Sequence, residues 1–395
     1  MVSVCMYFQV HQPFRLGRFQ FFNIGHGHPY YDDEKNQKLL DRIAAKCYLP
    51  ATKLLIELLE KHPEFRISFS ISGVALDQFE QYKPEVLEVF RTAVDTGKVE
   101  LLAETYYHSL AFIYSQDEFQ EQVKMHRRRI RELFGMTPSV LRNTELIYNN
   151  ALAEKAEEMG YKTVLLEGAD KVLGWRSPDF VYKPMNAKIR LLLKNYRLSD
   201  DVAFRFSQRS WKEWPLTVEK YASWINNING NGVTCNLFMD YETFGEHQWE
   251  STGIFDFLRH LPAEVLKHPD NNFRWPSEVS YENNPVGELD IPDYISWADI
   301  ERDLSAWLGN DMQRSALRVL YGMEEAVKES GDPQLLEDWR RLQTSDHFYY
   351  MCTKWFADGD VHKYFNPHDS PYDAFITYMN IMKDIQHRLT HSRRE

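Results

Sequence analysis

The chain begins with MVSVCMYFQVHQP at residues 1–13, where an apolar run, Val2–Val10, passes directly into His11, Gln12 and Pro13. A run of this kind predicts a first strand with polar side chains at its carboxyl end. No basic segment followed by a long apolar run stands before it, so we predict no secretion leader.

Beyond this strand, short β-like runs alternate with longer helical patterns. Strands are predicted at 65–72, 99–103, 140–144, 162–166, 188–194, 202–206 and 232–239. Helices are predicted at 38–61, 84–96, 116–134, 149–159 and 217–226. This alternation is typical of parallel strands joined by crossover helices, and seven or eight strands would suit a barrel of the α/β class.

The pattern changes after about residue 295. Four helical segments follow, at 297–308, 312–330, 333–344 and 371–388, with few strand candidates between them. We therefore predict a barrel domain over residues 1–294 and, over 295–395, a helical region that packs against it and completes the cleft.

Composition excludes several function classes. With 46 Lys and Arg against 58 Asp and Glu, the net charge is −12, which disfavours binding to the phosphate backbone of nucleic acids. No run of about 18 apolar residues is present, so no membrane span is predicted. The cysteines at 5, 47, 235 and 352 form no C-x-x-C pair, and we expect them to be reduced and buried. We expect the protein to be cytoplasmic.

Four of the predicted strands end in densely polar segments. They are HQP at 11–13, ETYYH at 104–108, RNTE at 142–145 and DYETFG at 240–245. In a parallel barrel the carboxyl ends of the strands meet at one face, where active sites lie. Ionisable groups gathered there are costly unless they are paired, solvated or used in chemistry.

Two of these segments supply carboxylates from separate strands, Glu145 and Asp240. A pair of carboxylates across a sugar is the arrangement of glycosidases. Taken singly, Glu145 could instead form a structural ion pair with Arg142, and Asp240 could cap a helix.

Metal binding is the main alternative for the histidines. His11 and His108 have acidic neighbours, and His26 and His28 share a glycine-rich loop. No H-x-x-x-H or H-E-x-x-H spacing supports a metal site, and phosphate loops and G-x-S-x-G elbows are absent. We predict no metal and no cofactor.

The motifs, in their order, resemble glycoside hydrolase family 57, and the resemblance covers most of the chain. The five that carry it are His11–Pro13, Gly97–Glu100 through His108, Arg142–Leu146, Asp240–Gly245 and SDHFYY at 345–350. The resemblance implies an incomplete seven-stranded (β/α)7 barrel. It also implies α-glucan substrates, with Glu145 as the nucleophile, Asp240 as the acid/base, and His11 and Asp346 at sugar-binding positions.

Within these motifs we predict substrate-binding roles for His11, Gln12, Glu104, Tyr107, His108, Arg142, Tyr241, His247, Asp346, His347 and Tyr349. The sequence departs from the family's glucanotransferase pattern at His108, where Glu is usual, and at His247 and Tyr349, where Trp is usual. These departures favour the α-amylase-like branch.

The leading hypothesis is a retaining hydrolase of α-1,4-glucans or maltodextrins. A glucanotransferase of the same family, a metal-dependent carbohydrate deacetylase and a catalytically silent glucan-binding protein are the alternatives. The sequence predicts neither the preferred chain length nor the oligomeric state.

Overall fold

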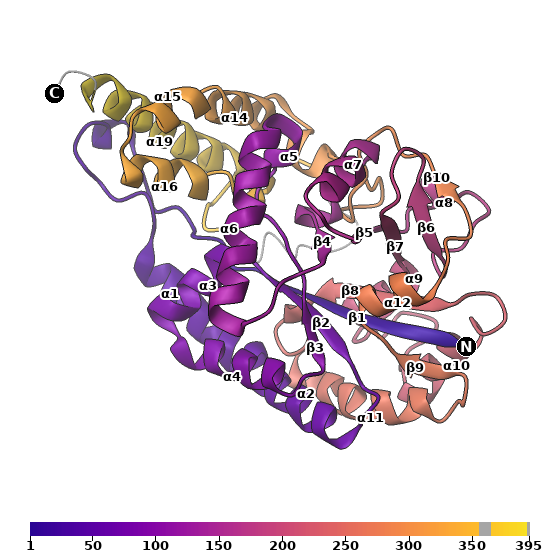
Figure 1. The fold of residues 1–395 in the computed structure, drawn as a ribbon. Coiled ribbons are helices and arrows are strands. Elements are labelled where there is room, and N and C mark those ends of the chain that lie inside the picture. The colour runs from indigo at the N-terminus through magenta and orange to yellow at the C-terminus, as the bar shows by residue number, and fades with distance from the viewer. Residues whose placement is uncertain (355–364, 393–395) are drawn as a thin grey trace.

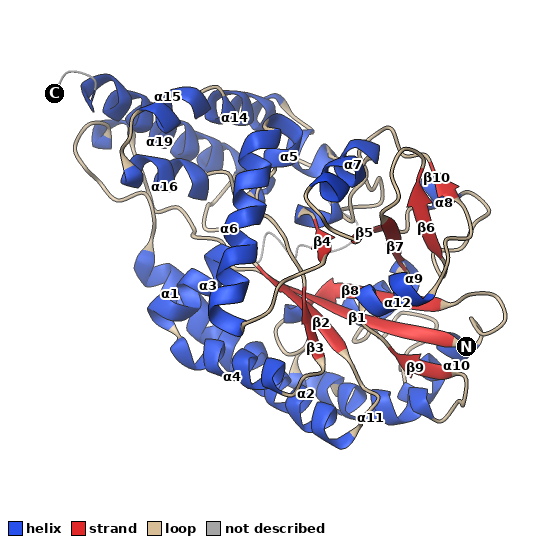
Figure 2. Ribbon diagram, in the orientation of Figure 1, coloured by secondary structure: helices blue, strands red, loops and turns tan. Residues whose placement is uncertain are grey.

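The computed structural model describes residues 1–354 and 365–392 and has an α/β fold (Figures 1 and 2). The first sheet contains β1 (Val2–Val10), β2 (Ile67–Ile71), β3 (Val99–Leu101), β8 (Thr234–Asp240) and β9 (Asn271–Phe273). All its strands are parallel, in the order β3-β2-β1-β8, and β9 pairs with the start of β1. Every residue of β1 is buried, as expected for a strand covered on both faces.

The second sheet contains β4 (Val140–Arg142), β5 (Thr163–Glu167), β6 (Val181–Pro184), β7 (Arg190–Lys194) and β10 (Glu288–Leu289). Its order is β10-β6-β7-β5-β4, with β6 antiparallel to β7. Thus the α/β class predicted from the sequence is confirmed, whereas the strands of the described residues form two sheets that do not close into one barrel.

Local contacts link the two sheets. An isolated bridge joins Ala103, beyond β3, to Leu141 of β4, and the Asn195 amide donates to the Asn236 carbonyl at 2.9 Å. Alternate residues of β1 face opposite ways: Phe8 packs toward the outer helices, while Tyr7 enters an apolar cluster built from strands of both sheets. The carboxyl ends of β1, β4 and β8 consequently lie near one another.

The helices of the strand-rich part are α1 (Asp33–Ile43), α2 (Leu49–Lys61), α3 (Gly73–Tyr82), α4 (Pro84–Asp95), α5 (Ala111–Tyr114), α6 (Gln116–Phe134), α7 (Asn150–Glu158), α8 (Asp170–Leu173), α9 (Tyr196–Ala203), α10 (Val218–Asn226), α11 (Ile254–Leu266) and α12 (Pro276–Glu282). A π-turn, η2 (Ala44–Tyr48), joins α1 to α2. The predicted helix 38–61 is therefore two helices and begins earlier, where Asp32 caps the Lys35 amide.

The later helices are α13 (Ser305–Leu308), α14 (Asp311–Tyr321), α15 (Glu324–Glu329), α16 (Pro333–Arg341), α17 (Ser345–Tyr349) and α19 (Pro371–Ser392). Most of them gather beside α5 and α6 (Figure 1). Their apolar side chains share one core with Leu16 and Phe19 near the amino end of the chain. The boundary near residue 295 stays a prediction.

Three predicted elements were wrong. Residues 202–206 form no strand, because α9 runs through Ala203 and its apolar face is buried. Residues 297–304 are not helical, and only α13 remains of the predicted helix 297–308. The predicted helix 312–330 is interrupted between α14 and α15, at Gly322 and Met323.

Candidate active site

Glu145 lies just beyond β4, in the short 3-10 turn η3 (Thr144–Leu146). Its backbone has φ of 57°, and Leu146 has φ of 51°, a left-handed conformation that is strained for residues with side chains. The carboxylate accepts hydrogen bonds from Trp297 Nε1 at 2.7 Å and Ser345 Oγ at 3.1 Å. The turn and these donors fix the carboxylate of a residue that is only 6% exposed.

His108 connects Glu145 to a second buried carboxylate, Glu104. Its Nε2 lies 3.3 Å from Oε1 of Glu145, and its Nδ1 lies 2.9 Å from Oε2 of Glu104. Burial opposes the imidazolium charge, but hydrogen bonds to both carboxylates outweigh it and raise the pKa of His108 to about 9. Burial likewise works against ionised Glu104, and contact with His108 nevertheless lowers its pKa to about 2. His108 therefore links two buried carboxyl groups, those of Glu104 and Glu145.

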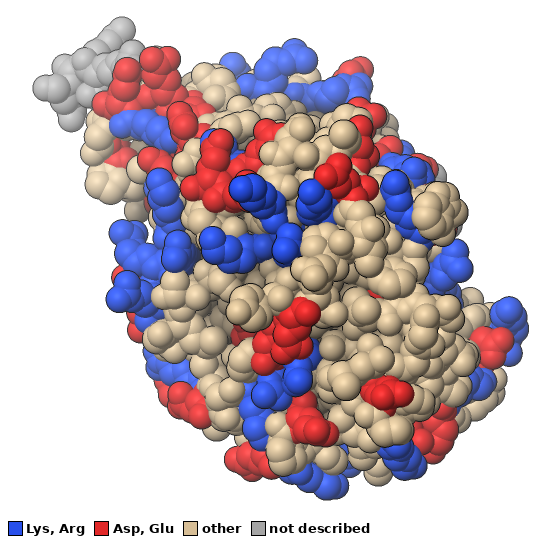
Figure 3. All heavy atoms as spheres, turned by 45° about the vertical axis from the view of Figure 1, so that its right-hand side comes forward, with Lys and Arg blue, Asp and Glu red and all other residues tan. Residues whose placement is uncertain are grey.

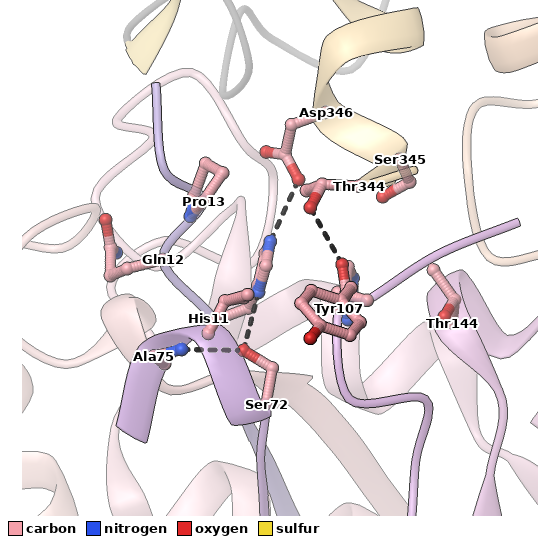
Figure 4. Close-up of polar contacts among 12 residues, drawn as sticks. His11, Gln12, Pro13, Ser72, Ala75, Tyr107, Thr144, Thr344, Ser345 and Asp346 are labelled. Carbon is pink, nitrogen blue, oxygen red and sulfur yellow. Dashed lines mark hydrogen bonds and ion pairs between the residues drawn. The ribbon is translucent and has the colours of Figure 1, made fainter. Parts of the chain in front are cut away.

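His11 stands at the end of β1 and stacks on His108, with ring centroids 3.9 Å apart. Figure 4 shows it between Ser72 and Asp346, whose Oγ and Oδ2 lie 2.7 Å and 3.0 Å from its ring nitrogens. Burial, followed by the charge of His108, lowers the pKa of His11. A neutral ring would donate from Nε2 to Asp346 and accept at Nδ1 from Ser72, whose oxygen accepts from the Ala75 amide at 3.3 Å.

Asp240 is the last residue of β8, and the chain turns immediately in η4 (Tyr241–Thr243). Because of this turn, Tyr241 points into the core, where its hydroxyl contacts Thr52 Oγ1 at 2.8 Å, and Glu242 lines a cavity together with Asp240. Burial, and then the charge of Asp240, raise the pKa of Glu242 to about 8. Tyr48 and Gln12 donate hydrogen bonds to Oε1 of this carboxyl group.

Two adjoining cavities lie at these strand ends, and both are lined by Glu145, Asp240, His247 and Trp297. The first, the His11 cavity, has a volume of about 80 Å³ and is also lined by His11, Gln12, His108, Glu242 and Asp346. The second, the Lys194 cavity, has a volume of about 90 Å³ and is also lined by Lys194, Asp200, Phe204, Arg302 and Tyr349. Both predicted catalytic carboxylates therefore face one space from two sheets.

Other predicted site residues lie behind this surface. Tyr107 is buried and donates to Glu337 at 2.6 Å, and Arg142 is buried with its guanidinium 4.8 Å from the centre of the Trp297 ring. His347 is buried too, and the loss of solvent lowers its pKa to about 4. These buried residues are placed to support the walls of the cleft, and so are Tyr241 and Glu104.

The sequence prediction missed Trp297, Ser345 and Lys194. Trp297 was assigned to a helix, yet it bonds to Glu145 through both its amide, at 3.1 Å, and its ring nitrogen. Ser345 begins the SDHFYY motif, which could have identified it. Lys194, at the end of β7, lies 2.9 Å from Asp200. Its position at the carboxyl end of a predicted strand could have identified it as a site residue.

Some properties concern the whole described chain. All four cysteines are free and buried, as predicted. Among residues 1–354 and 365–392, no three His, Cys, Asp or Glu side chains are grouped to hold a metal ion, and no helix is both long and apolar enough to cross a membrane. Acidic and basic side chains are intermingled on the face shown in Figure 3.

Paired carboxylates in a polar cleft at strand ends define a candidate glycosidase site. The sequence profile of glycosyl hydrolase family 57 matches residues 5–292. The "Putative alpha-amylase" of Methanocaldococcus jannaschii is 43% identical over 393 residues, covering 96% of this chain and 83% of that protein. The chain belongs to glycosyl hydrolase family 57 and is a glycosidase.

Solved structures share the fold at low sequence identity. The 4-alpha-glucanotransferase of Thermococcus litoralis matches with a TM-score of 0.72 and 15% identity, over 98% of this chain and 60% of that one. An alpha-amylase of Thermotoga maritima matches with a TM-score of 0.66 and 13% identity, over 99% of this chain and 94% of that one. These likenesses concern the fold alone.

Proposed function

We propose that this glycosidase hydrolyses α-1,4 bonds in starch- or glycogen-type glucans or maltodextrins, with retention of anomeric configuration. The observation that carries the proposal is that Glu145 and Asp240, from the ends of β4 and β8, line the same cavities. The family membership and the amylase name of the 43% identical relative support the substrate class.

In the proposed mechanism, Asp240 protonates the glycosidic oxygen while Glu145 attacks the anomeric carbon. The C–O bond to the leaving sugar breaks, and a covalent glycosyl-enzyme forms. Asp240 then accepts a proton from water, which attacks the anomeric carbon and releases Glu145. His108, Trp297 and Ser345 would hold the Glu145 carboxylate in line for the attack.

His11 and Asp346 are proposed to bind hydroxyls of the reacting sugar in the His11 cavity. Their mutual hydrogen bond, together with Ser72, presets the orientation of both groups. Bonds to hydroxyls that strengthen as the ring distorts contribute to transition-state binding. Their replacement is therefore expected to lower turnover while still permitting a covalent intermediate.

The wider setting is proposed on the same basis. The two sheets would act as the incomplete barrel of the family, with residues 295–395 completing the cleft. Four free cysteines suit a reducing compartment, and we place the enzyme in the cytoplasm.

The deciding experiment is incubation with maltoheptaose and amylose, with products separated by size and anomer. Shorter α-glucans with retained configuration are expected. Longer products would instead identify a glucanotransferase, and the inverted anomer would contradict the mechanism. EDTA-sensitive release of acetate from acetylated sugars, without glucan cleavage, would identify the deacetylase.

A further inference from the structure

A third cavity adjoins the Lys194 cavity. Its volume is about 580 Å³, within the range of roughly 300–1,000 Å³ typical of small-molecule sites. It shares Asp200, Phe204 and Arg302 with the Lys194 cavity. We call it the outer cavity.

The three cavities form a series. The His11 and Lys194 cavities share both catalytic carboxylates, whereas among the described residues the outer cavity shares no lining residue with the His11 cavity. We place the reacting sugar in the His11 cavity, beside His11 and Asp346, and the leaving group in the Lys194 cavity. Further sugars on that side would extend into the outer cavity.

The wall between the Lys194 and outer cavities is held by a network of charges. Asp200 lies 2.9 Å from buried Lys194 and 3.7 Å from Arg302. The Arg302 guanidinium stacks 4.1 Å from the centre of the Tyr196 ring, and the Tyr196 hydroxyl donates to Asp170 at 2.7 Å. These contacts preset the wall before a ligand arrives, which lowers the ordering cost of binding.

The chemistry of the outer cavity suits an uncharged polyol. Its cations, Lys171, Arg205 and Arg302, are matched in number by the acids Asp170, Asp200 and Glu301, so it has no excess charge to select an anion. Phe204 is 43% exposed and Ile300 is 70% exposed. Apolar surfaces among hydrogen-bonding groups match a sugar, whose ring faces carry C–H groups and whose edges carry hydroxyls.

Resting on the proposed function, we propose that the outer cavity binds glucose units on the leaving-group side of the scissile bond, with Phe204 as the stacking platform at its entrance. The enzyme would then favour substrates that extend several sugars toward the reducing end. Short maltooligosaccharides would leave this cavity unused.

The test compares kcat/KM for maltotriose and maltoheptaose in the wild type and Phe204→Ala. The exposed Phe204 side chain can be removed without opening the core. The ratio of maltoheptaose to maltotriose is expected to fall about tenfold, the size of effect that one lost aromatic contact gives. Tyr281→Ala is the matched control: Tyr281 is 92% exposed, lines a cavity with Lys162 and Arg190 beside the starts of β5 and β7, and should leave the ratio unchanged.

Binding provides a measurement that is independent of turnover. Calorimetry on Glu145→Gln protein with maltose and maltoheptaose should show tighter binding of the longer sugar. Adding Phe204→Ala to this variant should lower the ratio of the two affinities about tenfold. Equal losses for both sugars, or no preference for the longer one, would overturn the outer-cavity proposal. If the wild-type protein bound the longer sugar more tightly but cleaved no α-glucan, only the proposed function would be contradicted.

Discussion

The chain leaves β4 and β8 in different ways, and the two exits create different electrostatic surroundings. After β4, a left-handed turn carries Glu145 against His108, whose pKa is raised to about 9. After β8, Asp240 ends the strand itself, and its near neighbour in the cavity is Glu242, whose pKa is raised to about 8. A cation stabilises charge at the first carboxylate, while the second shares its cavity with a carboxyl group that holds a proton below about pH 8.

The surroundings of Glu145 suit the ionised form that the proposed nucleophile needs. A nucleophile must be ionised, and an acid must hold a proton at the same pH. At the end of β8, Asp240 and Glu242 share one cavity, and the raised pKa of Glu242 keeps a proton in this pair below about pH 8. Four substitutions test this difference, each at one of the two carboxylates or at the group beside it.

The largest effect is expected for Glu145→Ala. Loss of the nucleophile should lower kcat by about 10⁴-fold or more, because the covalent intermediate of the proposed mechanism forms on Glu145. Azide should restore part of the rate and give the inverted anomer. Turnover close to wild type in a folded variant would disprove the role of Glu145.

Asp240→Ala should lower kcat on maltodextrins by about 10²–10⁴-fold, the usual contribution of a general acid/base. An aryl glycoside with a good leaving group needs no acid, so the intermediate should form quickly, break down slowly and appear as a burst. Equal losses on both substrates, with no burst, would show that Asp240 is not the acid/base.

His108→Gln tests the cation on the Glu145 side and should lower kcat by about 100-fold, as the loss of one preorganised donor does. Stability gives a second measurement. The folded pKa of about 9 lies above the ordinary 6.5, so the stabilisation from protonated His108 is complete below pH 6.5 and is lost as the pH rises through 9. Urea unfolding at pH 6, 7.5 and 9.5 should show that the difference in free energy of unfolding between wild type and variant shrinks as the pH rises. A constant difference would contradict this.

Glu242→Gln tests the Asp240 side and should have the smallest effect. The folded pKa of about 8 exceeds the ordinary 4.5, so the wild type should lose stability as the pH rises from 4.5 to 8, and the variant should lose less. Gln still offers an oxygen to Tyr48 and Gln12, so the change at pH 5 should be about 1 kcal/mol or less. If the free energies of unfolding of wild type and variant differed by the same amount at pH 5 and pH 9, Glu242 would be ionised in the folded protein at both pH values.

The sequence by itself determined the α/β class, because apolar runs and helical periods are properties of neighbouring residues. Val2–Val10 and Gln116–Phe134 form as predicted, Asp240 ends β8, and Glu145 lies three residues beyond the end of β4. The polar motifs also led to the right family. These features depend on local order along the chain.

Tertiary structure alone decided which side chains meet. The donors to Glu145 come from positions 108, 297 and 345, and no local pattern relates them. The turn after β8 carries Tyr241 into the core and Glu242 into the cavity beside Asp240. A protonated Glu242 and a charged His108 follow from burial and contact, because a pKa depends on the solvent and charges around a group.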